Sequence, residues 1–244
     1  MLPIADRARA LARERAEAAP WLELLMKALS TPAWHRKVTL RASAERPLLD
    51  GAEVTIVPRS LARAVRALVA TTHDSRALIE AAIAHEELPD ELGPIAQLAA
   101  MPLLHSLRRE HPTSSSWEHG HCPLCGDWPT LAELRGLERE RHLRCGRCGS
   151  DWRSDARCPS CGARELALLV PDSDPESRRV ETCGACNGYL KTITTIAPIM
   201  AEAVPLEDLA SIELDLAALE RGYARPPASH AARLTLTPER SWWP

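Results

Sequence analysis

The sequence predicts an α+β fold with a mostly α-helical N-terminal domain, two four-cysteine β modules and a C-terminal helix. Apolar residues recur three and four positions apart through the first 110 residues, which is typical of amphipathic helices. All eight cysteines lie between residues 122 and 186, and all form Cys-x-x-Cys pairs. The intervals between these pairs contain short strand-forming runs. A chain of 244 residues is long enough for a larger domain and a smaller one.

The helical domain is expected to span residues 1–110, with a linker over residues 111–121. Its helices are predicted in stretches rich in Ala, Leu, Arg and Glu, namely IADRARALARERAEAA, PWLELLMKALS, SLARAVRALVATTHD, SRALIEAAIAHEEL and ELGPIAQLAAMPLLHSLRRE. The segment LLDGAEVTIVP predicts a turn and a short extended piece. Pro94 and Pro102 predict a division or kink in the last stretch. Breaks are expected at Pro20, Pro32, Pro58 and near Pro89.

Each Cys-x-x-Cys pair predicts half of a metal site. Two residues between thiols let a tight turn aim both sulfurs at one cation, and two such turns complete a tetrahedral shell. Nineteen residues separate the first pair from the second and twenty-one the third from the fourth, but only nine separate the second from the third. We therefore expect sequential pairing and two metal ions. Site 1 is Cys122, Cys125, Cys145 and Cys148 in a module over 122–157, and site 2 is Cys158, Cys161, Cys183 and Cys186 in a module over 158–197.

Each module is expected to be a β-hairpin with a cysteine turn at either end. The runs PTLAEL and HLRC predict strands in the first module, and ELALLV and RRVETC predict strands in the second. Residues 171–175 predict the turn of the second hairpin. Glycine follows the second cysteine in CPLCG, CGRCG and CPSCG, and asparagine follows it in CGACN. Both residues tolerate a positive φ, which lets backbone amides point at sulfur.

A C-terminal helix is expected over residues 198–225. Glu207 and Asp208 suit the positive end of its dipole. One side of this helix is apolar, and we expect that side to pack into the core rather than to form a docking groove. The apolar residues are Leu206, Leu209, Ile212, Leu216 and Leu219. The tail over residues 226–244 is expected to be loosely ordered.

The cysteines are expected to be reduced, in a cytoplasmic protein. A disulfide framework would need an oxidising compartment and usually a short secreted chain. Charged residues interrupt the first 20 positions, which therefore contain no apolar signal-peptide core. No apolar run approaches the length of a membrane span, so we expect no membrane insertion.

The charge balance argues against nucleic-acid binding. The formal net charge is −3, and between residues 122 and 197 Arg and Lys equal Asp and Glu in number. Phosphate binding needs a net basic surface. In the first module arginines interleave with carboxylates, which predicts a solvated strand face. These residues are Arg135, Arg139, Arg141, Arg144, Arg147, Arg153 and Arg157, with Asp127, Glu133, Glu138, Glu140, Asp151 and Asp155.

We do not expect an enzyme. All cysteines are assigned to metal, and the sequence contains no phosphate loop, His-Glu-x-x-His motif or serine nucleophile elbow. A closed four-thiolate shell also lacks the open position that metal catalysis requires. His119 and His121 are expected to be linker residues rather than ligands. Trp128, Trp152 and Tyr189 are expected to fill the small cores of the modules rather than to carry electrons.

Four motifs resemble the formate dehydrogenase accessory protein FdhE family: HCPLCGDWP, the Trp152 after the second cysteine pair, CNGYLKTI and EDLASIELDLAALERGYAR. The resemblance runs from about His121 to Arg225, and all eight cysteines match the family pattern. It implies rubredoxin-like or zinc-ribbon-like modules, with iron favoured as the metal. It also implies a cytoplasmic maturation factor for respiratory formate dehydrogenase that binds the catalytic subunit of that enzyme.

Two other functions stay open. The first is a rubredoxin-like iron protein that transfers electrons or senses redox state. The second, which the charge balance disfavours, is a nucleic-acid-binding zinc ribbon. Zinc is the alternative metal, because a four-thiolate shell suits iron and zinc equally.

Overall fold

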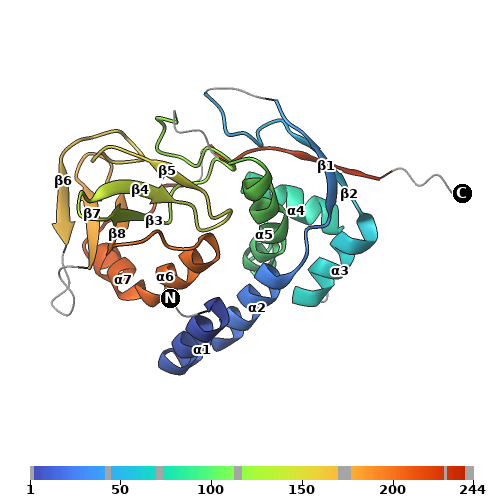
Figure 1. Ribbon diagram of the computed structural model, residues 1–244, viewed down its shortest axis with the longest axis horizontal. Coiled ribbons are helices and arrows are strands. Elements are labelled where there is room, and N and C mark those ends of the chain that lie inside the picture. The colour runs from blue at the N-terminus through green and yellow to red at the C-terminus, as the bar shows by residue number, and fades with distance from the viewer. Residues whose placement is uncertain are drawn as a thin grey trace, which may run out of the picture. The chain divides into compact units, whose positions relative to one another are not determined.

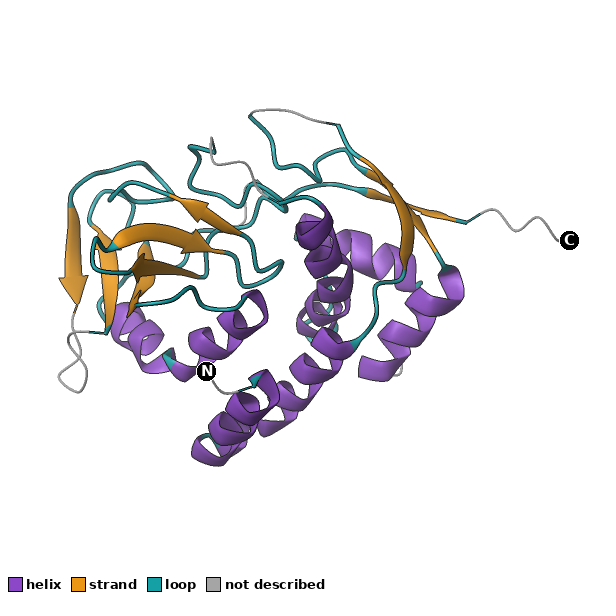
Figure 2. Ribbon diagram, viewed as in Figure 1, coloured by secondary structure: helices purple, strands orange, loops and turns teal. Residues whose placement is uncertain are grey.

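The computed structural model describes residues 3–41, 45–69, 74–112, 117–169, 177–227 and 230–239. The chain divides into two compact units (Figure 1). The helical unit is built mainly from residues 1–111 and 231–244, and the sheet unit mainly from residues 112–230. The chain contains both helices and β-strands, as Figure 2 shows, so the predicted α+β class is confirmed.

The helices of the helical unit follow the predicted stretches. They are α1 (Ile4–Glu14), α2 (Ala19–Ser30), α3 (Pro58–Leu68), α4 (Ser75–Ala84) and α5 (Gly93–Glu110), with a short 3₁₀ turn at Ala16–Ala18. Proline occupies the first turn of α2, α3 and α5, where its missing N–H costs nothing. The carboxylate of Asp74 caps α4 by accepting a hydrogen bond from the Arg76 amide.

Of the division or kink predicted for the last helix, the division does not occur, because α5 is a single element that continues through Pro102. An interior proline costs a helix about 3 kcal/mol. The following turn of α5 is fully buried at Leu103, Leu104 and Leu107, so packing offsets that cost.

Among the residues that the structure describes, no helix is both long enough and apolar enough to span a membrane.

The helical unit also contains a three-stranded sheet. Its strands are β1 (His35–Thr39), β2 (Glu53–Ile56) and β9 (Thr235–Pro238), in the order β1-β2-β9. β2 confirms the predicted extended piece. The prediction of a loosely ordered tail was wrong at β9, which pairs in parallel with β2 and buries Leu236. The alternation of LTLT in this segment is the strand signal that was missed.

One six-stranded sheet forms the centre of the sheet unit. Its strands are β3 (Leu131–Arg135), β4 (Glu140–Arg144), β5 (Asp151–Arg153), β6 (Leu166–Leu169), β7 (Arg178–Cys183) and β8 (Tyr189–Thr195). The order is β5-β4-β3-β8-β7-β6. The hairpins β3–β4 and β6–β7 are the two that the sequence predicts. The predicted turn at 171–175 and linker residues 113–116 lie outside the described residues.

The two predicted modules are not separate bodies, because strand β8 joins them. β8 pairs antiparallel with β7 and parallel with β3, where Leu131 lies opposite Lys191 and Arg135 opposite Thr195. An ion pair between Arg141 of β4 and Glu181 of β7, at 2.6 Å, also links the two halves. The two cysteine modules therefore share one hydrogen-bonded sheet.

The C-terminal helical segment is divided, although one helix was expected. After a 3₁₀ turn at Ala201–Ala203, it forms α6 (Val204–Ala210) and α7 (Ile212–Glu220). Between these helices the Ser211 hydroxyl donates to the carbonyl of Glu207. Leu214 and Ala218 of α7 pack against Val180 and Tyr189 of the sheet. Leu216 and Leu219 are about half exposed, so the prediction that the whole apolar stripe is core was wrong for α7.

Candidate metal centres

The structure brings the eight cysteines together in two groups of four. Group 1 is Cys122, Cys125, Cys145 and Cys148, and group 2 is Cys158, Cys161, Cys183 and Cys186. Within each group the sulfurs lie within 4.8 Å of one another. Each group thus combines two consecutive Cys-x-x-Cys turns.

All four turns have the same backbone construction. The amide of the first cysteine donates to the carbonyl five residues later: Cys122 to Asp127, Cys145 to Ser150, Cys158 to Ala163 and Cys183 to Gly188, over 2.7–3.0 Å. The residue after the second cysteine has a positive φ in every turn, as the sequence predicts. These residues are Gly126 (78°), Gly149 (73°), Gly162 (78°) and Asn187 (54°).

The sulfur positions fit a tetrahedral thiolate site. A metal–sulfur bond of about 2.3 Å places the sulfurs of a regular tetrahedron about 3.8 Å apart. Cys122 and Cys148 are 3.5 Å apart in group 1, and the pairs Cys158–Cys186 and Cys161–Cys183 are 3.7 and 3.6 Å apart in group 2. A disulfide needs about 2.05 Å, and none of the eight cysteines forms one. Each group could therefore hold one metal ion.

The two groups differ in exposure. All four cysteines of group 1 are completely buried. In group 2, Cys158 and Cys183 are buried, but Cys161 and Cys186 are exposed. The two groups therefore have the same four-cysteine composition but differ in their exposure to solvent.

The thiols of group 2 differ in acidity. Burial raises the pKa of Cys158 to about 12, although backbone amides oppose this change. Burial also disfavours the thiolate of Cys183, but hydrogen bonds from the amides of Cys186 and Ala185 outweigh it and lower the pKa to about 7. Backbone amides within the turn therefore donate hydrogen bonds to the Cys183 sulfur, as expected for a turn that ends in a residue with positive φ.

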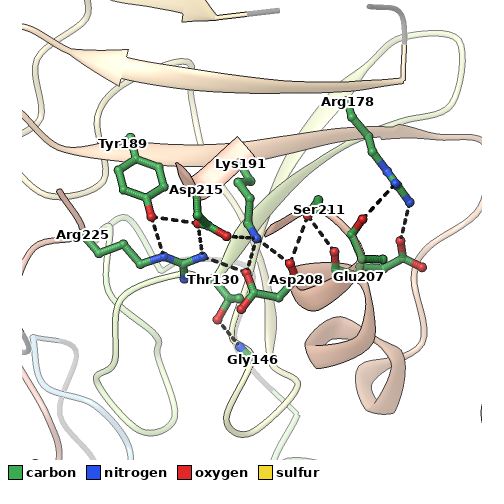
Figure 3. Close-up of polar contacts among 11 residues, drawn as sticks. Thr130, Gly146, Arg178, Tyr189, Lys191, Glu207, Asp208, Ser211, Asp215 and Arg225 are labelled. Carbon is green, nitrogen blue, oxygen red and sulfur yellow. Dashed lines mark hydrogen bonds and ion pairs between the residues drawn. The ribbon is translucent and has the colours of Figure 1, made fainter. Parts of the chain in front are cut away.

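Two glycines in the second cysteine turn of group 1 pack closely against neighbouring residues. A β-carbon on Gly149 would lie 2.5 Å from Cβ of Ala201, and one on Gly146 would meet the side chain of Thr130. The Gly146 amide already donates to the Thr130 hydroxyl over 2.8 Å (Figure 3). In group 2, β-carbons on Gly162 and Gly184 would meet nothing within 4 Å.

Gly149→Ala and Gly162→Ala form a matched pair for testing this packing. Both glycines follow a cysteine turn with nearly the same positive φ, so each alanine should cost about 1–2 kcal/mol of backbone strain. Only Gly149→Ala adds a clash with Ala201, so we expect it to lower the free energy of unfolding by about 1–3 kcal/mol more. Denaturant unfolding of the two variants measures this difference. Equal losses would contradict the packing role.

The arginines of the first module are paired, and several are buried. Arg144 is paired with Glu133, and both side chains are inaccessible. The prediction of a solvated strand face was therefore wrong for these two residues and for Arg141. The ion pairs are Arg135 with Glu133 and Asp151, Arg141 with Glu181, Arg144 with Glu133, Arg147 with Asp127, Arg153 with Glu140 and Arg157 with Asp155.

A buried lysine anchors α6 and α7 to the sheet, a feature that sequence reasoning missed (Figure 3). Nζ of Lys191, on β8, has no exposed surface and lies 2.5 Å from Asp208 and 2.6 Å from Asp215. Arg225 binds the same two carboxylates at 2.7 and 2.9 Å, and the Tyr189 hydroxyl donates to Asp215. The sequence feature that could have indicated this cluster is the set of charged residues between the apolar positions of EDLASIELDLAALERGYAR.

The remaining highlighted residues lie around the cysteine groups. Trp152 and Tyr189 are buried, in agreement with a packing role. Trp128 donates a hydrogen bond from its indole N–H to the carbonyl of Pro227. Neither His119 nor His121 belongs to a cysteine group. His121 is buried, and its ring stacks on His230 with centroids 4.2 Å apart.

Fold and site together define a class: a helical unit joined to a sheet that carries two four-cysteine groups. The solved structure of the FdhE protein from Pseudomonas aeruginosa shares this fold, with a TM-score of 0.61 at 21% identity over 93% of this chain and 94% of that one. The family model described as "FdhE, C-terminal domain" matches residues 156–230. Over this domain the chain is similar to FdhE proteins, which confirms the predicted resemblance.

Curated relatives show the same resemblance. A "Protein FdhE homolog" from Haemophilus influenzae (strain PittEE) is 36% identical over 109 residues, which are 43% of this chain and 36% of the relative. One from Aquifex aeolicus (strain VF5) is 35% identical over 116 residues, which are 45% of this chain and 40% of the relative. The matches thus span well under half the length of these relatives.

Proposed function

We propose that this chain is a cytoplasmic accessory factor in the assembly of respiratory formate dehydrogenase and that it binds the catalytic subunit of that enzyme. The observation that carries the proposal is the FdhE C-terminal domain over residues 156–230, which includes all of group 2. The proposed role is binding rather than catalysis, because four thiolates fill a tetrahedral shell and leave no position for a substrate.

The sheet unit suits such a role because it presents a rigid surface. Metal bound by both groups would tie together the turns at the ends of the two hairpins, and metal binding of this kind contributes directly to folding. The cysteine ligands are proposed as Cys122, Cys125, Cys145 and Cys148 for one ion and Cys158, Cys161, Cys183 and Cys186 for the other. Iron is the proposed metal, with zinc as the alternative.

A deletion strain tests the accessory role. We expect loss of this gene to abolish formate-dependent respiratory activity, and the tagged chain to co-purify with the formate dehydrogenase catalytic subunit. Reintroduced wild-type protein should restore activity, which controls for effects on neighbouring genes. Normal formate dehydrogenase activity in the deletion strain would contradict the proposal.

The exposure of Cys161 and Cys186 favours a second candidate, a surface iron centre that transfers electrons or senses redox state. Electron exchange with a partner requires a centre close to the surface, and group 2 meets that requirement. Protein purified without oxygen would then contain iron with a reversible one-electron signal. Bound zinc, which is redox-inert, would exclude this candidate.

A further inference from the structure

We propose that group 2 is an exchangeable metal centre that accepts and releases a soft divalent cation, whereas group 1 holds its cation permanently. This inference deepens the proposed function by assigning different roles to the two centres. It rests on metal binding by both groups and not on the identity of the partner protein.

The first support is the difference in exposure between the cysteine residues of the two groups. No thiol of group 1 is accessible, so an incoming ligand reaches these sulfurs only after local unfolding. In group 2, Cys161 and Cys186 come from different turns, and both are exposed. A competing chelator can therefore displace one thiolate from each turn while the sheet stays folded.

Open space beside group 2 is the second support. A mostly polar pocket of about 240 Å³ is lined by Cys158 and Cys161 together with Glu118, His119 and Arg157. A pocket of this size admits a small chelating molecule. Carboxylate, imidazole and guanidinium groups can hydrogen-bond a polar chelator there.

The backbone of the cysteine turns provides independent support. Gly146 and Gly149 of group 1 are backed so closely by Thr130 and Ala201 that neither position has room for a methyl group. Gly162 and Gly184 of group 2 face open space. The chain is therefore closely packed at these two glycines of group 1 and not at the two glycines of group 2.

Metal release from the full-length protein tests the proposal. Protein loaded anaerobically with two equivalents of Zn²⁺ is mixed with an excess of a chromogenic chelator, and iodoacetamide is added in a parallel sample. We expect two release phases of one equivalent each, with rates that differ on the order of tenfold or more. Mass spectrometry should find Cys161 and Cys186 alkylated during the fast phase, before any cysteine of group 1.

Single variants assign the phases. Cys161→Ser and Cys186→Ser should each remove the fast equivalent and leave the slow one unchanged. The wild-type alkylation order provides the assignment even if a matched group 1 variant, Cys122→Ser, fails to fold. A single phase for both equivalents, first alkylation in group 1 or a preparation that binds no zinc would overturn the proposal. Co-purification with formate dehydrogenase is a separate readout, so a negative exchange result leaves the accessory role standing.

Discussion

Replacing Cys183 with alanine is expected to remove one of the two metal equivalents and to destabilise the sheet unit severely. Cys183 ends β7 and is buried, and its sulfur is 3.6 Å from that of Cys161 in the opposite turn. Structural zinc sites contribute about 10–16 kcal/mol of binding energy in small domains, and that energy is coupled to folding. Loss of one ligand should forfeit several kcal/mol of it. Metal analysis and calorimetric unfolding measure the two effects.

Cys122→Ala is the matched variant in group 1, and it should remove the other equivalent. From the sequence alone, each substitution would be expected to disturb only its own module. The shared sheet changes this expectation, because β3 and β8 form a continuous ladder between the two groups. Hydrogen exchange should therefore show lost protection on both sides of the β3–β8 pairing, with the larger loss on the side of the substitution.

Ser160→Ala is the control for both variants, because Ser160 lies inside a cysteine turn but offers no thiolate. It should retain two metal equivalents. Unchanged metal content in Cys122→Ala and Cys183→Ala would contradict the ligand assignment. Loss of both equivalents in either variant would show that the groups do not bind independently.

The cysteine turns could be predicted in detail because their determinants are local. A Cys-x-x-Cys-Gly sequence fixes the spacing of the sulfurs and the residue with positive φ within five positions. The structure accordingly places positive φ at Gly149 and Gly162, and at Asn187 in the one turn without glycine. The interval lengths between pairs also predict the grouping of the eight cysteines that the structure contains.

The joining of the two hairpins could not be predicted in the same way. The parallel pairing of β3 with β8 connects residues about 60 positions apart, and no turn sequence specifies its register. Periodicity also failed to distinguish the faces of α7, because Leu214 and Ala218 face the sheet while Leu216 and Leu219 are exposed on another side. A helix with apolar residues all round gives no signal for its buried face.

The buried ion pairs were missed for a related reason. Sequence reasoning treats Arg144 and Glu133 as surface residues because such side chains are rarely buried. In the structure Arg144 lies opposite Leu131 and Glu133 opposite His142, so the two charged side chains meet diagonally across the β3–β4 hairpin and neutralise one another. The partner of a charged strand residue depends on register and sheet order, so burial of this kind becomes visible only in three dimensions.

Lys191→Met is the second substitution from which we expect a large effect. It keeps the side-chain volume but removes the ammonium group that contacts Asp208 and Asp215 (Figure 3). Removing one partner of a buried ion pair costs about 3–5 kcal/mol, because the other charge stays buried without compensation. Arg225 still contacts both carboxylates, so we expect a loss near the lower end, about 3 kcal/mol. Denaturant unfolding of the variant and the wild type measures this loss in the free energy of unfolding.

Arg153→Met is the matched control, because Arg153 forms an exposed ion pair with Glu140 on the same sheet. An exposed pair contributes at most about 1 kcal/mol, so this variant should unfold almost like the wild type. The double variant Lys191→Met/Asp215→Leu should regain part of the loss, since it removes the uncompensated carboxylate together with its partner. Wild-type stability in Lys191→Met would show that Arg225 alone neutralises both aspartates.

The pH dependence of the Lys191→Met effect identifies its electrostatic origin. Burial works against ionisation of Asp215, but hydrogen bonds and charge from Lys191 and Arg225 outweigh it and hold the pKa of this carboxyl below its usual value. A carboxyl with a lowered pKa in the folded state stabilises the protein above its unfolded pKa of about 3.9, and this contribution is lost as the pH falls through the folded pKa. The stability difference between wild type and Lys191→Met should therefore be constant near neutral pH and shrink below about pH 4. A difference that stays constant through this range would mean that lost packing, not lost charge, destabilises the variant.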